Sequence, residues 1–311
     1  MSQTEILRVQ NLKKTFRVGF WRKRVEAVRN VTFGVRESEI FGIVGPNGAG
    51  KTTTMKIIMN LILADDGEVE IFGEPSTRTE SRRRLGYLPE EPYFYDHLTV
   101  TELLHYYGSL HGMSNRDIAD RTGELLELVG LDDVPKRRLR EFSKGMRQRA
   151  GIAQALINDP ELVILDEPQS GLDPVGRKEV RDLIFDLREE GRTVVFSSHI
   201  LVDVEAVCDR VAIMNEGKLV EVADLDELGD STEKPVELVV EGLEIEDARK
   251  LDGAAECEQR GKTLVLRLEP DATLETTLSE LAARDVRILE LTRSLDRLED
   301  RFLMDTGHSE Q

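Results

Sequence analysis

Residues 45–52 form a pattern that binds phosphate. They match every fixed position of G-x-x-x-x-G-K-[ST]. Glycines leave room for backbone N–H groups to surround phosphate oxygens, and a helix that follows offers its positive N-terminus. The pattern predicts that Lys51 reaches the β- and γ-phosphates and that the Thr52 hydroxyl binds Mg²⁺. The predicted phosphate-binding residues are Gly45, Pro46, Asn47, Gly48, Ala49, Gly50, Lys51, Thr52 and Thr53.

Two adjacent carboxylates follow a short apolar run. Asp166 and Glu167 come directly after four apolar residues at 162–165. They therefore stand at the C-terminal end of a predicted strand, where nucleotides bind in open α/β sheets. Because neighbouring strand residues point different ways, one carboxylate can hold a metal's hydration shell while the other contacts an attacking water. The alternative is a turn in which these residues only cap a helix.

Three further segments are typical of nucleotide-handling proteins, at 87–90, 142–146 and 197–199. Each alone is weak, but together with the phosphate loop and the carboxylate pair they form five elements in series. The series predicts an enzyme that binds and hydrolyses a nucleotide.

The elements that must position these residues follow an α/β pattern. The apolar run 40–44 predicts a buried strand that ends at the phosphate loop, and a helical stretch at 55–61 follows it. Helical periodicity dominates from 99 to about 158. The remaining predicted elements are strands at 6–9, 25–35, 162–165 and 193–196, with a turn-like stretch at 17–24 and a crossover helix at 177–190.

A second, smaller domain is predicted after a linker. Residues 229–235 have linker composition, so the predicted boundaries are 1–228, 229–235 and 236–311. The order of elements beyond the linker, βαββαβ, predicts a small α+β ferredoxin-like domain with one extra helix at 294–304. Its predicted strands are 236–240, 255–259, 263–268 and 286–291, with helices at 245–251 and 274–283.

The amino-acid composition limits the kinds of partner that are expected. The 311 residues include 42 basic and 60 acidic side chains, a net charge of -18, so nucleic acid is not expected as a partner. Two cysteines suit a reducing cytosol, and no signal peptide is expected at the start of the sequence. No apolar run approaches the roughly 20 residues that span a bilayer. If the protein acts at a membrane, we therefore expect it to do so by binding a partner protein.

These motifs, together with the residues after each, resemble those of an ATP-binding cassette (ABC) ATPase over about residues 5–228. The resemblance rests on the phosphate loop, the segment 142–149, Asp166-Glu167-Pro168, the segment 170–173 and His199. It implies a P-loop ABC ATPase core with an antiparallel β subdomain and a helical subdomain at about 92–160. The terminal segment 293–303 is similar to that of daunorubicin-resistance-like and sodium-exporter-like ATPases.

The same resemblance implies roles for the site residues. Two copies, or one copy and a paralogous subunit, would sandwich two ATP molecules head to tail, with Ser143 and Gly145 on the γ-phosphate across the dimer. Glu167 would act as general base, and His199 would hold the water and the γ-phosphate. Asp173 would communicate between the two sites. Phe16 would stack on adenine, although packing in a core explains it as well.

Several positions depart from the usual family pattern. Lys144 and Met146 replace a glycine and a glutamine of the signature motif, and Gln169 replaces a small residue. Lys144 would stand near a triphosphate or point to solvent. Glu90 stands where a glutamine usually contacts Mg²⁺, and its carboxylate can still bind the metal.

Three segments are candidates for contacts with partners. Consecutive aromatics at 93–95 would form a groove for a helix of a membrane subunit, unless two are buried and one is exposed. Residues 20–24 form an aromatic-basic loop, which is either a lipid-headgroup contact or a solvated hairpin tip. In the terminal helix, one apolar stripe would belong to the core of the small domain or to a dimer contact; it comprises Leu295, Leu298, Phe302 and Leu303.

The resemblance implies a function in membrane transport. The chain would be the ATP-binding, ATP-hydrolysing subunit of an exporter, cytoplasmic and peripheral on the inner face of the cell membrane, bound to integral permease subunits. The alternatives are the ATPase of a non-transporting mechanotransmission complex and a soluble ABC ATPase.

Overall fold

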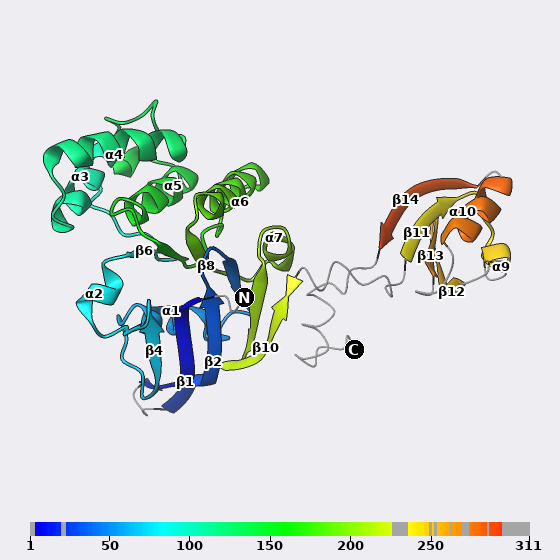
Figure 1. Cartoon of the computed structure of the whole chain (residues 1–311). Coiled ribbons are helices and arrows are strands. Elements are labelled where there is room, and N and C mark those ends of the chain that lie inside the picture. The colour runs from blue at the N-terminus through cyan, green and yellow to red at the C-terminus, as the bar shows by residue number, and fades with distance from the viewer. Residues whose placement is uncertain are drawn as a thin grey trace. The chain divides into compact units, whose positions relative to one another are not determined.

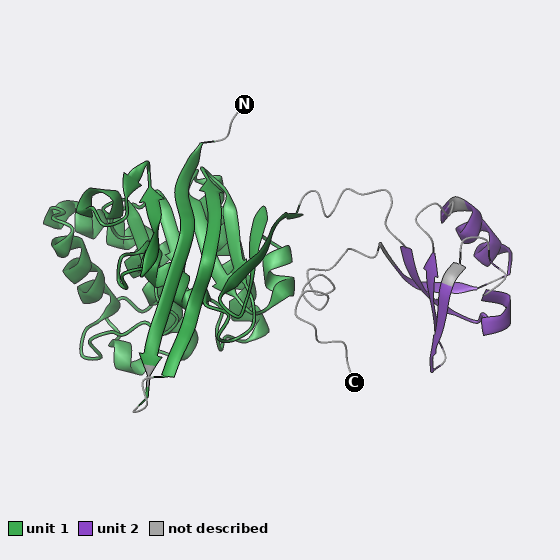
Figure 2. Cartoon of the chain, turned by 90° about the horizontal axis from the view of Figure 1, so that it is seen from below, with its two compact units in different colours: residues 1–225 green, residues 226–311 purple. Residues whose placement is uncertain are grey.

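The computed structural model describes residues 4–19, 23–225, 236–248, 251, 254–261, 263–268, 274–284 and 286–293. The chain forms two compact units, Met1–Leu225 and Asp226–Gln311, coloured green and purple in Figure 2. The predicted linker at 229–235, the aromatic residues Phe20 and Trp21, and the predicted helix at 294–304 with its apolar stripe lie outside the described residues.

The first unit is built on a six-stranded sheet of order β10-β9-β3-β8-β7-β6. All neighbours pair in parallel except β10 with β9. Strands β3, β7 and β8 are buried along their whole length, as the apolar sequences of β3 and β7 predict for a sheet covered on both faces. The strands are β3 (Ile40–Val44), β6 (Leu85–Leu88), β7 (Leu162–Leu165), β8 (Thr193–Ser198), β9 (Arg210–Asn215) and β10 (Lys218–Asp224). Because β8 alone separates β3 from β7, the phosphate loop and the carboxylate pair emerge at the same edge.

An antiparallel sheet of order β2-β1-β4-β5 packs against this core. Its strands are β1 (Glu5–Val18), β2 (Lys23–Arg36), β4 (Asp66–Ile71) and β5 (Glu74–Pro75). The predicted strand at 6–9 was too short, because β1 pairs with β2 from Glu5 to Val18. The two strands include both ends of the predicted turn-like stretch at 17–24, and they connect within it, between Val18 and Lys23. The pairing shifts register between Val9 and Leu12, where Asn11 has a φ of 48°. That irregularity breaks the alternation by which a strand is recognised.

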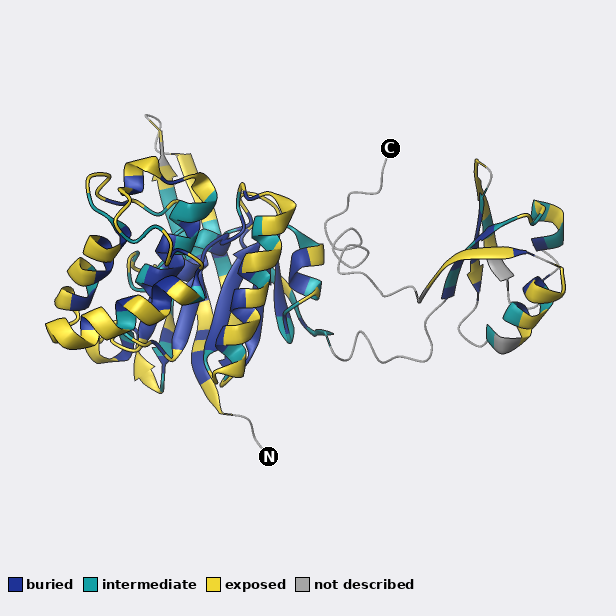
Figure 3. Ribbon diagram, turned by 90° about the horizontal axis from the view of Figure 1, so that it is seen from above, coloured by how far each residue is buried: buried dark blue, intermediate teal, exposed yellow. Residues whose placement is uncertain are grey.

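Helices surround the central sheet and extend beyond it (Figure 1). Side chains cap several of them; Thr99 and Glu102 form a capping box on α3, and Ser143 accepts a hydrogen bond from the backbone of Met146 on α5. In Figure 3 the central strands are buried, whereas the helices have exposed outer faces. The helices are α1 (Lys51–Ile58), α2 (Thr79–Arg82), α3 (Val100–Leu110), α4 (Asn115–Leu128), the short 3-10 helix η1 (Leu139–Glu141), α5 (Lys144–Ala155), α6 (Pro174–Glu189) and α7 (Leu201–Glu205). The α/β core with an antiparallel sheet and a helical segment, expected from the sequence, is confirmed.

The second unit is a four-stranded antiparallel sheet of order β12-β13-β11-β14. Alternate residues of β11, such as Leu238 and Val240, pack with Leu266 and Leu281 into its core. Its elements are β11 (Val236–Glu241), α9 (Ile245–Ala248), β12 (Ala254–Arg260), β13 (Thr263–Leu268), α10 (Leu274–Ala283) and β14 (Arg287–Arg293). Among the helices of the described residues, none has both the length and the apolar character needed to cross a bilayer.

Candidate nucleotide site

The phosphate loop opens into a cavity of about 500 Å³. It lies beside the β1–β2 hairpin, which contributes Phe16 and its cross-strand partner Val25. The cavity is lined by Phe16, Val25, Glu26, Ala27, Asn47, Gly48, Ala49, Gly50, Lys51, Thr52, Thr53, Glu90 and Glu167. Most residues predicted to bind nucleotide therefore meet in one place. The sequence did not single out 25–27, because only the register of the hairpin brings them beside the loop.

The backbone of the loop is held in one conformation by close neighbours. Gly50, the residue before α1, has a φ of 100°, and a Cβ there would lie 2.3 Å from the Ala27 carbonyl oxygen. Only glycine fits such a position. The loop is tied to the β9–β10 turn, where the Gly217 N–H donates to the Ala49 carbonyl at 3.0 Å.

Lys51, Glu167 and His199 form a chain of contacts at the floor of the cavity. The Lys51 ammonium lies 3.2 Å from Glu167 Oε1 and donates to the Gly45 carbonyl at 2.7 Å. The other Glu167 oxygen, Oε2, lies 2.8 Å from His199 Nδ1. The Lys51 and Glu167 side chains are only 6% and 9% exposed, so each charge is compensated mainly by the other.

Asp166 sits behind this chain, beside the start of α1. Its Oδ1 accepts from the Thr52 hydroxyl at 3.1 Å and from the Ser197 hydroxyl at 2.8 Å. Burial raises the pKa of Asp166, while the hydrogen bonds from Ser197 and Thr52 lower it less. Its Oδ2 is buried with no hydrogen-bond partner among the described residues. An unpartnered carboxylate oxygen next to a threonine hydroxyl is a donor set that suits a hard cation such as Mg²⁺.

Ser197 forms hydrogen bonds with both residues of the carboxylate pair, a contact that sequence reasoning missed. Its hydroxyl oxygen accepts from the Glu167 backbone N–H at 2.9 Å while it donates to Asp166. Glu167 has a φ of 49°, a backbone conformation rare for residues other than glycine and common at functional sites. The sequence drew attention to 197–199 only through His199. Nearby, burial and the Asp166 charge raise the pKa of Tyr87 to about 12.

A second group of predicted site residues does not line this cavity. It comprises Ser143, Lys144, Gly145 and Asp173, which lie at the N-terminal ends of α5 and α6. A Cβ on Gly145 would lie 3.6 Å from Leu172, so the two helix starts are in contact. Asp173 caps α6, where its Oδ1 accepts from the Gly176 N–H at 2.8 Å. Within one chain, the predicted residues therefore fall into two groups.

The aromatic segment at 93–95 is mostly exposed. Tyr93 and Tyr95 are 88% and 51% exposed, whereas Phe94 is 5% exposed. The alternative of two buried aromatics and one exposed was wrong, because only Phe94 enters the core. Tyr93 and Phe94 help to line a cavity of about 400 Å³ that also includes Tyr107 and Gln154.

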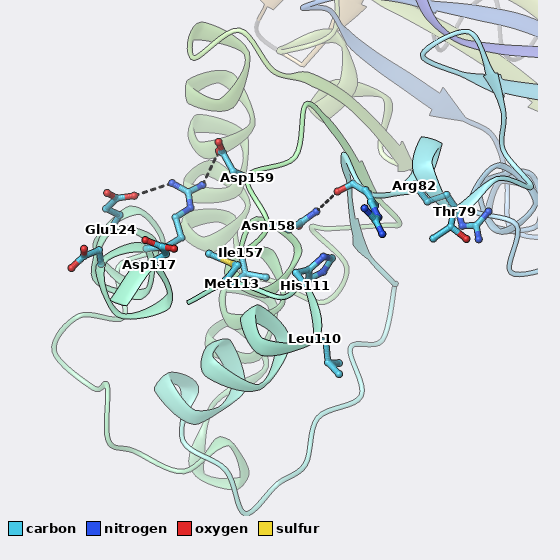
Figure 4. A pocket seen from close by; sticks show the side chains of 13 residues that line it. Thr79, Arg82, Leu110, His111, Met113, Asp117, Glu124, Ile157, Asn158 and Asp159 are labelled. Carbon is cyan, nitrogen blue, oxygen red and sulfur yellow. Dashed lines mark hydrogen bonds and ion pairs between the residues drawn. The ribbon is translucent and has the colours of Figure 1, made fainter. Parts of the chain in front are cut away.

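A larger cavity of about 860 Å³ lies next to this one, with Arg82, His111 and Asn158 lining both. Figure 4 shows acidic side chains on one side, among them Asp117 and Glu124, and Arg82 on the other. The Asn158 amide donates to the Arg83 and Leu85 carbonyls, both at 3.0 Å, and so ties the end of α5 to β6. The two cavities form a polar and aromatic depression apart from the phosphate loop.

The chain is similar to known ATP-binding proteins. The family described as ABC transporter matches residues 28–170. Over 304 residues the chain is 40% identical to an uncharacterized ABC transporter ATP-binding protein of Synechocystis sp., covering 97% of this chain and 84% of that protein. It is 37% identical over 293 residues to the bacitracin transport ATP-binding protein of Bacillus licheniformis, covering 89% and 92%. A solved dimeric ATP-binding cassette in a post-hydrolysis state, bound to ADP and Pi, superposes with a TM-score of 0.65 at 26% identity and covers 70% of this chain and 98% of that one.

Proposed function

Since this chain belongs to the ABC transporter ATP-binding proteins and is an ATPase, we propose that it is the energy-coupling subunit of a membrane exporter. In this proposal two copies close head to tail around two ATP molecules, and hydrolysis reopens them. A relative whose name assigns it to bacitracin transport supports a role of this chain in transport. The ATPase would then be cytoplasmic, at the inner face of the membrane.

The proposed chemistry rests on the cluster around Lys51. ATP would enter the cavity beside Phe16, and the Lys51 ammonium would leave Glu167 to bind the β- and γ-phosphates. Glu167, released from that ion pair, would accept a proton from the attacking water, with His199 orienting both the water and the γ-phosphate. The loop amides contribute fixed dipoles that do not have to reorganise during the reaction.

Thr52 and Asp166 are the residues that would hold Mg²⁺. When bound there, the ion neutralises charge that develops on the phosphates. The unpartnered Oδ2 of Asp166 supports this assignment. Glu90 is an exposed member of the same cavity and would contribute a further oxygen ligand.

The second copy would complete the site with Ser143 and Gly145. The observation that carries this proposal is that these residues are exposed or half-exposed at the start of α5 and do not line the cavity of their own chain. A helix start without an acidic residue in its first turn favours an anion. In a second copy, that anion would be the γ-phosphate.

The depression formed by the cavities of about 860 and 400 Å³ is the proposed docking place for a membrane subunit. Tyr93 and Tyr95 would supply an aromatic rim for a helix of that subunit, since exposed aromatics are enriched at the centre of protein interfaces. Because this surface follows Glu90 directly in sequence, movement of the docked helix would be transmitted to the nucleotide site.

Substitution of Ser143 tests the sandwich. We expect Ser143→Arg to abolish turnover and to leave nucleotide binding by the single chain unchanged, because the long side chain blocks the face that meets the second copy. Arg116→Ala on α4, another change on the helical segment, is the control and should behave as the parent. ATP hydrolysis that is independent of protein concentration and unimpaired in Ser143→Arg would rule out the sandwich.

A further inference from the structure

The edge strand β14 of the second unit has three exposed apolar side chains. Ile288, Leu289 and Leu291 are 38%, 47% and 44% exposed. β14 pairs with β11 at one edge of the sheet (Figure 1). The strand at the opposite edge, β12, has exposed charged side chains such as Glu256 and Glu258, which suit a strand that stays in contact with water. The edge at β14 is therefore apolar, whereas the edge at β12 is charged.

Two of the apolar side chains lie on the face of the sheet that carries the helices. Ile288 pairs with Val240, and Leu291 pairs with Leu238. Paired residues of neighbouring strands point to the same side of a sheet. Val240 and Leu238 are fully buried in the core of the unit, together with Leu281 of α10. Among the described residues, the helical layer thus covers β11 but stops short of β14.

The sequence that follows β14 carries a second apolar surface. It lies outside the described residues. The helix predicted there from the sequence, at 294–304, has an apolar stripe that consists of Leu295, Leu298, Phe302 and Leu303. These positions follow the spacing i, i+3, i+7 and i+8 of one helix face, and the other residues from 296 to 301 are all charged. A helix with this pattern gains most of its stability by packing its stripe against another apolar surface.

We propose that the segment 294–304 packs on β14 of the same chain and covers Ile288, Leu289 and Leu291. A helix of this length extends about 16 Å, at about 1.5 Å per residue. The strand from Ile288 to Arg293 spans about the same length, at about 3.3 Å per residue. A helix that folds back along β14 therefore reaches all three side chains. Covering them removes an exposed apolar edge that would otherwise favour unspecific association between chains.

The short connection favours a segment of the same chain over that of a second copy. β14 ends at Arg293, and the apolar stripe begins two residues later at Leu295. Two surfaces joined so closely meet at an effective concentration of about 1 mM or more. A second copy would have to exceed that concentration to compete for β14. In this arrangement the stripe belongs to the core of the small domain and is not a contact between two chains.

The test measures the reaction of a thiol on β14 with N-ethylmaleimide in the full chain. Ile288→Cys is compared with Ile288→Cys/Leu298→Asp, in which a charge disrupts the apolar stripe. We expect the double variant to be labelled about tenfold faster or more, because the thiol at 288 loses its apolar cover. Mass spectrometry of the peptides separates this thiol from Cys208 and Cys257. Ile288→Cys/Arg297→Asp changes the charged side of the same segment and should be labelled as slowly as Ile288→Cys.

A native thiol reports whether the small domain stays folded during this comparison. Cys257 is half-buried and packs against the core of the second unit, so unfolding would speed up its labelling as well. We expect its rate to be the same in all variants. If Leu298→Asp also accelerates Cys257, the milder Leu298→Ala takes its place, and labelling at 288 must then rise while the rate at Cys257 does not. Equal rates at 288 with and without the change at Leu298 would overturn the inference.

The dependence on protein concentration separates the same chain from a second copy. Labelling of Ile288→Cys should be equally slow over about a hundredfold range of concentration well below 1 mM, because the cover is intramolecular. An excess of the parent chain should not slow the labelling of Ile288→Cys/Leu298→Asp. Protection that grows with concentration, or that the parent chain restores, would place a second copy on β14 and refute the proposed arrangement.

Discussion

Replacing Glu167 by glutamine should both stop turnover and tighten the binding of ATP. Glu167 Oε1 lies 3.2 Å from the Lys51 ammonium, and both side chains are nearly buried. Any nucleotide that recruits Lys51 must first open this ion pair. Glutamine keeps the shape and one acceptor but removes the charge, so Lys51 is released more easily and the carboxylate no longer repels the γ-phosphate.

The size of the expected gain in ATP affinity follows from the contact between Glu167 and Lys51. A hydrogen bond between charged groups contributes about 1.5–3 kcal/mol and a neutral one about 1 kcal/mol. The difference of about 0.5–2 kcal/mol corresponds to a dissociation constant for ATP that is roughly 2- to 30-fold lower. Loss of Glu167, the proposed general base, should lower kcat by a factor of about 10²–10⁴.

Affinity is measured with a non-hydrolysable ATP analogue at protein concentrations where the chain is a monomer, and turnover by phosphate release. Glu26→Gln is the matched control, since Glu26 lines the same cavity but pairs with Arg29 at 3.3 Å instead of with Lys51. It should change affinity far less. An unchanged or weaker affinity in Glu167→Gln, or an affinity gain matched by Glu26→Gln, would refute the reasoning; rapid hydrolysis would remove Glu167 from its role.

Three further outcomes follow from single side chains. Asp166→Asn should stabilise the empty protein at pH 7 by about 1 kcal/mol, because burial raises the pKa of this carboxyl and its ionised form opposes folding. Below the ordinary carboxyl pKa of 3.8, Asp166 is protonated in the folded and the unfolded parent and does not oppose folding; the parent loses stability as pH rises through the raised pKa of the folded state. The stability gained by Asp166→Asn, measured by urea unfolding, should therefore vanish as pH falls toward 3.8. Thr99→Ala should lower the free energy of unfolding by about 1 kcal/mol through loss of the capping box on α3, whereas Ser109→Ala, within the helix, should cost less. Burial raises the pKa of the Cys208 thiol well above its ordinary value, so iodoacetamide followed by mass spectrometry should modify the half-buried Cys257 first; faster labelling of Cys208 in the native protein would contradict this.

The parts of the site that could be predicted are those set by local sequence. A phosphate loop needs a strand, a glycine-rich turn and a helix, all within 40–58, and the structure has them in that order. The pair Asp166-Glu167 ends a buried strand, which is enough to place it at the nucleotide edge of the sheet. Both the phosphate loop and the carboxylate pair are contiguous in the chain, so short-range sequence patterns are enough to predict them.

What could not be predicted depends on pairings between distant segments. Ser197 joins the Asp166 carboxylate to the Glu167 backbone N–H, and these residues lie 31 and 30 positions away in the sequence. Nothing in the run 193–198 distinguishes its hydroxyl from that of Ser198. The length of β1 was missed because a register shift interrupts its alternation. Likewise Gly145 lies close to Leu172 only because α5 and α6 begin side by side.

The buried ion pair also explains why the empty site can keep its catalytic groups in place. A lone charge with an exposure below 10% costs several kcal/mol, and Lys51 and Glu167 avoid that cost by facing each other. The same contact occupies Glu167, so under the proposed mechanism its carboxylate cannot act as the base until the Lys51 ammonium moves away. Binding of a nucleotide must then exchange one partner of Lys51 for another, a phosphate oxygen for a carboxylate oxygen. In the proposed mechanism this exchange frees Glu167 only when phosphate arrives, so the proposed base is released only when there is a substrate for it to act on.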